Sequence, residues 1–176
     1  LGAYARVFGT VTPTYLFGPC ATGVYTIPAA YSNVKAVYTN TAPVDAYRGA
    51  GRPEATYTIE RLVEKAAMEL GIDKTEIRMK NFPSEFPFKQ TLVHTVDSGD
   101  YVAGLEKAKQ MADYAGFDAR RKKSEANGKL RGIGVSSYFE ACGIAPSAAV
   151  MSLGCGVGLW ESAEVRFNPT GQISVF

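Results

Sequence analysis

The sequence has few of the side chains that bind metal ions: three cysteines and one histidine among 176 residues. The cysteines are far apart, at Cys20, Cys142 and Cys155, and they form no CxxC pair. These shortages argue against a zinc or iron–sulfur site built by this chain alone. Because a sparse and odd set of cysteines is typical of a reducing compartment, we predict a cytoplasmic protein, either free or peripheral to the inner face of the membrane.

The sequence also lacks an apolar run of about 18 residues, which a membrane-spanning helix needs, and it has no basic-then-apolar signal pattern at its start. Its 19 basic and 17 acidic residues leave a net charge of +2, which argues against a nucleic-acid partner. The content of 46% hydrophobic and 20% charged residues is globular. The chain begins at Leu1 without a methionine and stops at Phe176 within a predicted strand, so we expect an internal fragment.

Three parts of the chain differ in pattern. Residues 1–52 are rich in Tyr, Val, Thr, Gly and Pro, which predicts short strands and turns, including a strand at Val34–Asn40, and no long helix. Residues 53–129 predict helices. Residues 130–176 predict strands again, at Gly132–Phe139 and in a hairpin formed by residues 161–167 and 172–176. This order of elements predicts an α+β fold with mixed strands and packed helices.

The clearest predicted helix begins after Arg52, with Pro53 in its first turn and Gly71 at its end. Its predicted apolar face consists of Ile59, Leu62, Val63, Ala66 and Leu70. A second helix should cover Lys74–Lys80, capped by Asp73.

A third helix is expected at about residues 100–114, capped by Ser98 or Asp100. Its predicted core face consists of Val102, Leu105, Ala108 and Ala112. The charged stretch 120–129 carries both signs, which is typical of a solvated helix end and loop.

The segment most suggestive of chemistry is Ala46–Glu54, AYRGAGRPE, a glycine turn directly before the first helix. Glycines permit unusual backbone angles and close approach of a ligand, and N–H groups at a helix start favour oxyanions. Arg48 and Arg52 bracket the turn with fixed positive charge. The turn therefore either cradles an anion or oxo group, or serves only as structure; spacing alone leaves both open.

The longer run VDAYRGAGRPEATYTIERLVEKAAMELGIDKTEIRMKNF is similar to the active-site loop and following helices in large subunits of the xanthine oxidase, aldehyde oxidase and carbon monoxide dehydrogenase family. Residues 132–147 and 158–176 resemble later parts of the same subunit. The resemblance implies that residues 1–176 are an internal fragment of the molybdopterin-binding region. It implies that Tyr47, Arg48, Gly49, Ala50, Gly51 and Arg52 form the loop that contacts cofactor and substrate.

The resemblance implies an enzyme, a molybdenum-dependent oxidoreductase with water as the oxygen source. Carbon monoxide dehydrogenases that bind copper have AYRCSFR at this loop, whereas this chain has Gly49 in place of the cysteine. Because glycine cannot bind copper, we expect an aldehyde or N-heteroaromatic substrate. Carbon monoxide oxidation is the alternative, and a non-catalytic interaction domain is the alternative of another class.

The resemblance further implies molybdopterin cytosine dinucleotide as cofactor, with the catalytic glutamate and other cofactor loops outside this chain. The fragment should therefore be inactive alone. The implied partners are a flavin-binding (FAD) medium subunit and a small subunit with [2Fe–2S] clusters, in a dimer of heterotrimers.

Other reactive side chains are interpreted as structural. Glu140 and Cys142 have no histidine close in sequence, so Cys142 is expected to be a small buried hydrophobe. His94 is expected to be structural or at the surface. Trp160 should fill a core or subunit contact, and Glu161 and Glu164 should be solvated.

Overall fold

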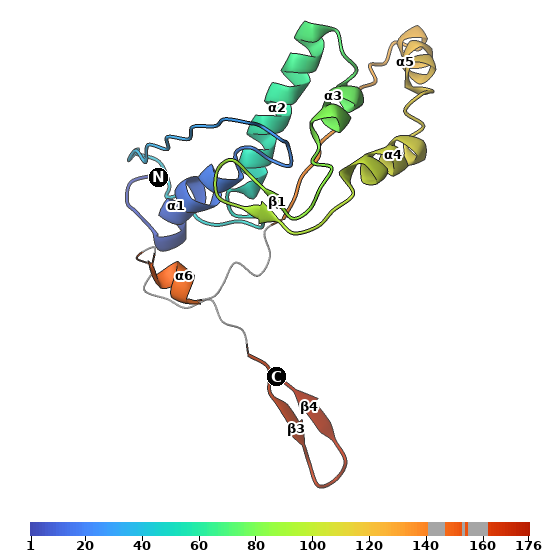
Figure 1. Cartoon of the computed structure of the whole chain (residues 1–176). Helices are drawn as coiled ribbons and strands as arrows, with labels where there is room; N and C mark the ends of the chain where they lie inside the picture. The colour runs from blue at the N-terminus through green and yellow to red at the C-terminus, as the bar shows by residue number, and fades with distance from the viewer. Residues whose placement is uncertain (141–146, 153, 155–161) are drawn as a thin grey trace. The chain divides into compact units, whose positions relative to one another are not determined.

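The computed structural model describes residues 1–140, 147–152, 154 and 162–176. The chain divides into two compact units, Leu1–Glu140 and Ala141–Phe176, which we treat separately. The first unit contains α1 (Val7–Val11), the π-helical turn η1 (Thr12–Leu16), the 3-10 turn η2 (Gly18–Cys20), α2 (Arg52–Leu70), α3 (Lys74–Asn81), β1 (Phe88–Lys89), β2 (Thr95–Val96), α4 (Tyr101–Met111) and α5 (Phe117–Ala126) (Figure 1). The second contains α6 (Ser147–Ser152), β3 (Val165–Phe167) and β4 (Ile173–Val175).

The three predicted helices are confirmed. Helix α2 has Pro53 in its first turn, and it ends at Gly71, whose φ of 65° is left-handed. Helix α3 begins after Asp73, whose carboxylate accepts the backbone N–H groups of Thr75 and Glu76. Of the two caps proposed for α4, the structure has Asp100, which accepts the N–H of Ala103 at 2.9 Å.

The predicted C-terminal hairpin is also confirmed. Strands β3 and β4 pair antiparallel, with Val165 opposite Val175 and Phe167 opposite Ile173. The turn between them includes Gly171, whose φ is 85°. The strands are shorter than predicted, and residue 161, where the first was to begin, lies outside the described residues.

The short strands predicted for residues 1–52 are not found there, whereas the prediction of no long helix before Arg52 is confirmed, because each helical element in that part has five residues or fewer. Residues 7–20 form α1, η1 and η2, because Pro13 lies in a first turn, where its missing N–H removes no helical hydrogen bond. The predicted strand Val34–Asn40 is exposed and pairs with no described strand. Residues 132–139 likewise lack a described partner strand, but their side chains alternate between exposed and half-buried. That alternation is typical of an extended chain packed on one face.

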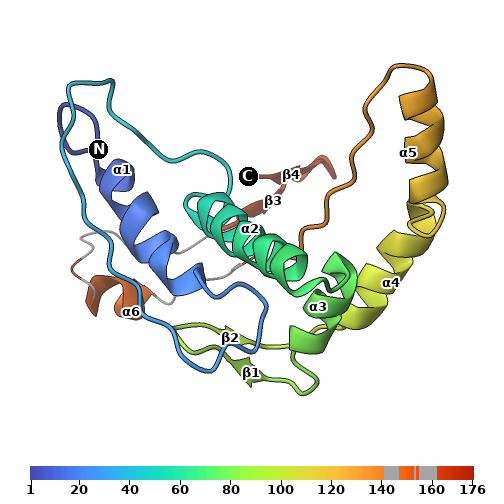
Figure 2. The ribbon, with the colours of Figure 1, turned by 90° about the horizontal axis from the view of Figure 1, so that it is seen from above.

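The core of the first unit is small. It consists of Val24, Tyr25, Ile59, Phe82 and Leu105. Tyr25 and Phe82 stack with their ring centroids 5.7 Å apart. Helix α2 lies between the N-terminal helical segment and α3 (Figure 2). The apolar residues of α2 that these neighbours bury are Ala55, Ile59 and Ala67.

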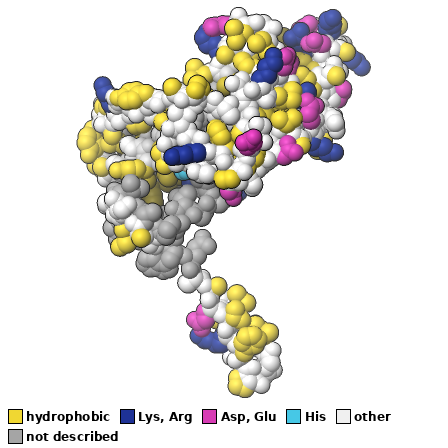
Figure 3. All heavy atoms as spheres, viewed as in Figure 1, with side chains coloured by type: hydrophobic (Ala, Val, Ile, Leu, Met, Phe, Trp, Pro, Cys, Tyr) yellow, Lys and Arg dark blue, Asp and Glu magenta, His cyan; other side chains and the backbone are white. Residues whose placement is uncertain are grey.

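Several residues predicted to lie in the core are exposed. Leu62 and Leu70 of α2 are 58% and 66% exposed, and in α4 only Leu105 of the four predicted core residues is buried. These helices pack through a narrower face than their apolar periodicity predicts. As predicted for the charged stretch, α5 has no buried residue; Figure 3 shows charged side chains gathered around it and hydrophobic ones at the surface elsewhere. Within the described part of the chain, no helix is both long enough and apolar enough to cross a bilayer.

Candidate functional site

The loop Tyr47–Arg52 has an unusual backbone. Gly49, Ala50 and Gly51 have φ values of 95°, 39° and 90°, so three consecutive residues lie at positive φ. Such angles are natural for glycine but cost energy at an alanine. The N–H of Ala50 donates to the carbonyl of Tyr47 at 2.8 Å, and the N–H of Arg52 donates to the carbonyl of Gly49 at 3.1 Å. The segment is therefore a tight turn that leads directly into α2.

The glycines of this loop are required by packing inside the protein. A Cβ atom at Gly51 would lie 2.4 Å from the carbonyl oxygen of Thr12 and 2.9 Å from the backbone nitrogen of Phe17. A Cβ atom at Gly49 would lie 2.7 Å from Cγ of Pro53. The loop thus approaches the backbone of η1 more closely than any side chain allows. The sequence interpretation assigned this freedom to a ligand, whereas the structure uses it at least partly for the fold.

The two arginines of the loop have different environments. Arg48 is exposed, and the ring of Tyr47 is 89% exposed. The side chain of Arg52 is only 13% exposed. Its Nη1 donates to the carbonyl oxygen of Gly49 at 3.1 Å, and its Nε lies 3.0 Å from Oε1 of Glu140. Arg52 therefore braces the loop, and Arg48 presents its charge to the surroundings.

A hollow of about 530 Å³ lies beside the loop. It is lined by Arg48, Gly49, Arg52, Pro53, Thr56, Tyr57, Ser136, Tyr138, Phe139 and Glu140. The sequence interpretation missed the contribution of residues 136–140, which are distant in sequence from the loop. Their alternating pattern indicated an extended segment, but nothing in it indicated that Glu140 faces Arg52.

Cys20 and His94 both lie within the electrostatic influence of Arg52. Burial raises the pKa of the Cys20 thiol, an effect that Arg52 opposes and Glu140 reinforces, so the sulfur stays protonated. Burial, assisted by Arg52, lowers the pKa of His94. Its imidazole meets the ring of Phe139 edge-on, with centroids 6.0 Å apart. A neutral, ring-packed histidine agrees with the structural role predicted for His94.

The described residues contain no group of three or more His, Cys, Asp and Glu side chains able to hold a metal ion. Cys142, Cys155, Trp160 and Glu161, which the sequence interpretation singled out, lie outside the described residues. Glu164 is exposed and pairs with Arg166 at 2.8 Å.

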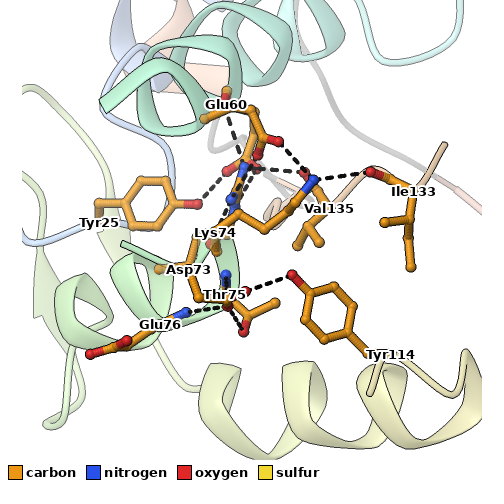
Figure 4. A network of polar contacts seen from close by, with 11 residues as sticks. Tyr25, Glu60, Asp73, Lys74, Thr75, Glu76, Tyr114, Ile133 and Val135 are labelled. Atoms are coloured by element: carbon orange, nitrogen blue, oxygen red, sulfur yellow. Dashed lines mark hydrogen bonds and ion pairs between the residues drawn. The ribbon is translucent and has the colours of Figure 1, made fainter. Parts of the chain in front are cut away.

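A buried polar network joins α2 and α3 (Figure 4). The guanidinium of Arg78 is fully buried, and its Nε donates to Oε2 of Glu60 at 2.9 Å. Glu60 also accepts a hydrogen bond from the hydroxyl of Tyr25. Burial and this hydrogen bond raise the pKa of Tyr25 well above its ordinary value. Sequence reasoning treated this face of α2 as apolar and did not anticipate a buried ion pair.

The same network reaches the extended segment that lines the hollow. Nη2 of Arg78 donates to the carbonyl of Val135 at 3.1 Å, and Nζ of Lys74 donates to the carbonyl of Ile133 at 3.0 Å. Lys74 also pairs with Glu64 at 2.9 Å. Burial alone would raise the pKa of Glu64, but Lys74 and Arg78 outweigh it and lower that pKa. The cations of α3 are thus compensated by acids of α2 and by backbone carbonyls.

Comparison with known proteins decides the family. A model of the molybdopterin cofactor-binding domain matches residues 1–82, and a second model of that description matches residues 107–176. The chain is 41% identical to the carbon monoxide dehydrogenase large chain of Hydrogenophaga pseudoflava over 93% of its own length. The chain belongs to the molybdopterin-binding large subunits of the xanthine oxidase, aldehyde oxidase and carbon monoxide dehydrogenase family. The family expectation from the AYRGAGR loop is therefore confirmed.

Solved structures of molybdopterin-binding subunits have the same fold. Quinoline 2-oxidoreductase from Pseudomonas putida 86 matches 99% of this chain with a TM-score of 0.86 and 33% identity. Carbon monoxide dehydrogenase from Oligotropha carboxidovorans matches 90% of it with a TM-score of 0.76 and 36% identity. This chain spans only about a fifth of each relative, namely 21% of the H. pseudoflava chain, 22% of the quinoline enzyme and 21% of the O. carboxidovorans chain. The α+β fold predicted from the sequence is confirmed as part of the molybdopterin-binding subunit.

The residues beside the loop have the donors that an anionic, oxygen-rich cofactor needs. Arg48 supplies an exposed guanidinium, a group that matches phosphate and oxo groups, and Arg52, which is bonded to Gly49 and Glu140, adds positive charge beside it. The backbone carbonyl of Thr12 faces Gly51, and the hydroxyl of the same residue is buried without a hydrogen-bond partner among the described residues. A buried hydroxyl of this kind calls for a polar partner. The loop is therefore compatible with a molybdopterin group.

Proposed function

We propose that the intact protein is the large subunit of a molybdenum hydroxylase that oxidises an aldehyde or an N-heteroaromatic compound, with water as the oxygen source. The observation that supports this choice most strongly is the backbone at Gly49. Residue 49 is a glycine, and with φ at 95° and Cγ of Pro53 only 2.7 Å from the point that a Cβ atom would occupy, the present conformation of the turn suits glycine rather than a cysteine. A copper site requires a soft thiolate ligand, which this loop cannot supply.

Cys20 does not replace the missing ligand. Its side chain is 5% exposed, and burial raises the pKa of its thiol, whereas copper binding requires the deprotonated sulfur. We therefore propose a molybdenum site without copper. Similarity to quinoline 2-oxidoreductase over 99% of this chain supports an N-heteroaromatic substrate as one of the two classes.

Each part of the loop has a proposed task. When bound, the molybdenum cofactor supplies a metal centre that activates water and accepts electrons from the substrate. Arg48 would bind anionic oxygen atoms of the cofactor or substrate, and Arg52 would keep the loop in shape. The rings of Tyr57, Tyr138 and Phe139 line the hollow and would offer an apolar wall to a planar substrate. The proposed contact residues remain Tyr47, Arg48, Gly49, Ala50, Gly51 and Arg52.

The assembly and the finer identity of the cofactor are proposals of the same kind. We propose the cytosine dinucleotide form of molybdopterin, a flavin-binding medium subunit with FAD and a small subunit with [2Fe–2S] clusters. Two such heterotrimers would form a dimer in the cytoplasm. Similarity to subunits of multi-subunit molybdenum enzymes supports the presence of partner subunits.

Oxidation of carbon monoxide is the second candidate, favoured by the 41% identity to a carbon monoxide dehydrogenase large chain. The test is turnover of the purified full-length complex with an aldehyde, with quinoline and with carbon monoxide, using an artificial electron acceptor in ¹⁸O-labelled water. We expect labelled product from an aldehyde or quinoline and none from carbon monoxide. Carbon dioxide formed from ¹³C-labelled carbon monoxide would favour the second candidate. No turnover in a complex that lacks molybdenum would favour a non-catalytic interaction domain.

A further inference from the structure

The conformation of the loop is strained at Ala50 and needs to be held in place. Ala50 has a φ of 39°, which is unfavourable for a residue with a Cβ, and it lies between two glycines that are free to adopt other conformations. The side chain that spans the turn is Arg52, whose Nη1 donates to the carbonyl of Gly49 at 3.1 Å. The orientation of this guanidinium therefore affects the shape of the loop.

Glu140 is the acid that orients this guanidinium. Its Oε1 lies 3.0 Å from Nε of Arg52, on the other side of the fork from the bond to Gly49. The arginine is 13% exposed and the glutamate is 49% exposed, so the pair is partly shielded from water. One planar group thus connects the loop to residue 140.

The position of Glu140 depends on the register of the extended segment 133–140. Val135 and Phe139 pack against the core and Ser137 is half-buried, whereas Ser136, Tyr138 and Glu140 are exposed. The cations of α3 fix this register, because Lys74 donates to the carbonyl of Ile133 and Arg78 donates to that of Val135 (Figure 4). A slip of one residue would turn Glu140 to the opposite face of the segment.

We propose that Glu140 is a positioning residue of the candidate site, which acts through Arg52 to hold the glycine loop, in a register that Lys74 and Arg78 set. The expected effect of Glu140 on turnover rests on the proposed function, whereas its effect on the conformation of the loop does not. The connection runs from α3 through the carbonyls of residues 133 and 135 to Glu140, and then through Arg52 to the carbonyl of Gly49. The contacts at both ends of this route are hydrogen bonds or ion pairs of the first unit, and the backbone of residues 135–140 joins them.

The test is hydrogen exchange of loop peptides in the full-length complex, together with kcat and KM for the substrate that the complex oxidises. In Glu140→Ala, the amides of Ala50 and Arg52 should exchange about two- to fivefold faster, the change expected when a half-exposed ion pair is lost. Glu140→Gln retains an acceptor for Nε and should restore most of the protection. The kcat of Glu140→Ala should fall more than that of Glu140→Gln. Glu69→Ala is the matched control, because Glu69 pairs with Lys65 at the surface of α2.

Coupling between the two side chains is tested by the double variant. Arg52→Lys keeps the charge but cannot donate to Glu140 and Gly49 at once. If Glu140 acts through Arg52, adding Glu140→Ala to Arg52→Lys should leave loop exchange unchanged. Independent, additive effects would overturn the proposal, and so would normal loop exchange in Glu140→Ala.

The register is tested by the variant Lys74→Met. Lys80→Met is the control, because the described ion pair of Lys80 is with Glu76 of the same helix. Lys74→Met should speed exchange across residues 134–140, whereas Lys80→Met should not. Equal exchange in the two variants would overturn the role of Lys74. If the wild-type complex lacks molybdenum and turnover but the variants show the exchange effects, the proposed function is wrong and the positioning role of Glu140 holds. If the wild-type complex turns over substrate but the variants show no exchange effect, the proposed function holds and the positioning role is wrong.

Discussion

At the scale of single residues, the glycine loop shows how one pattern can have two physical causes. The sequence interpretation explained Gly49 and Gly51 by the approach of a ligand. The structure places the backbone of η1 against Gly51 and the ring of Pro53 against Gly49, so both positions would need glycine even without a ligand. A sequence cannot distinguish the two causes, because glycine satisfies both.

Gly51→Ala should therefore displace the loop. Its Cβ would lie 2.4 Å from the carbonyl of Thr12, and φ is 90°, so strain and overlap act together. We expect loss of most molybdenum and turnover in the full-length complex, and Gly51→Phe should be at least as severe. Gly104→Ala is the control, because a Cβ there meets nothing within 4 Å and alanine favours a helix. Normal turnover in Gly51→Ala would contradict the loop geometry.

Arg48→Ala should impair the site without unfolding the protein, because Arg48 is exposed at the edge of the hollow. Loss of a charged hydrogen bond of about 1.5–3 kcal/mol predicts roughly a 10- to 150-fold decrease in kcat/KM or a matching loss of cofactor. Arg61→Ala, on the exposed surface of α2 and outside the hollow, should behave as wild type. Kinetics and metal analysis of both variants provide the measurement; equal behaviour would remove Arg48 from the site.

At the scale of elements, helices were predictable where end signals and local sequence agree. Pro53 and Gly71 mark α2, and Asp73 marks α3, through bonds made within a few residues. Strands were harder to predict, because the pairing of a strand depends on residues that are far away in the sequence. The segment Val34–Asn40 has strand-like residues and bonds to Leu1 and Gly2, but no described strand pairs with it. The buried pair of Arg78 and Glu60 joins two helices that sequence reasoning treated separately.

The α3 cap predicts a measurable pH dependence. Burial would raise the pKa of Asp73, but hydrogen bonds from Thr75, Tyr114 and Glu76 lower it to about 2, from an ordinary value of 3.8. Because the folded pKa lies below the unfolded one, this contribution is present above about pH 4 and is lost as pH falls towards 2. Asp73→Ala should destabilise α3 by about 1 kcal/mol at pH 7, seen as faster hydrogen exchange of that helix. The difference in hydrogen exchange of α3 between the variant and the wild type should be smaller at pH 3 than at pH 7. An equal difference at both pH values would contradict the lowered pKa of Asp73.

The ion pair between α2 and α3 should be costly to break. Arg78→Met leaves Glu60 buried without its cation, and loss of one partner of a buried pair costs about 3–5 kcal/mol. We expect lower soluble yield and faster exchange in both helices. Lys80→Ala removes a surface pair with Glu76 and should change stability by less than about 1 kcal/mol. Similar exchange in the two variants would show that the buried pair does not hold the helices together.

At the scale of the whole molecule, this chain corresponds to about a fifth of a molybdopterin-binding subunit. Large side chains remain exposed along its extended segments, including Tyr31 at 87% and Tyr38 at 62%. Sequence resemblance identified the family, since the AYRGAGR loop and the helix after it are local. It could not identify Glu140 as the partner of Arg52, because that contact joins residues 88 positions apart and requires the folded segment 133–140.

The central claim is that the loop belongs to a molybdenum site without copper, and elemental analysis of the purified full-length complex tests it most directly. We expect about one molybdenum atom per large subunit and no stoichiometric copper, because Gly49 supplies no thiolate and burial keeps Cys20 protonated. Copper in a one-to-one ratio with molybdenum would contradict this account of the loop.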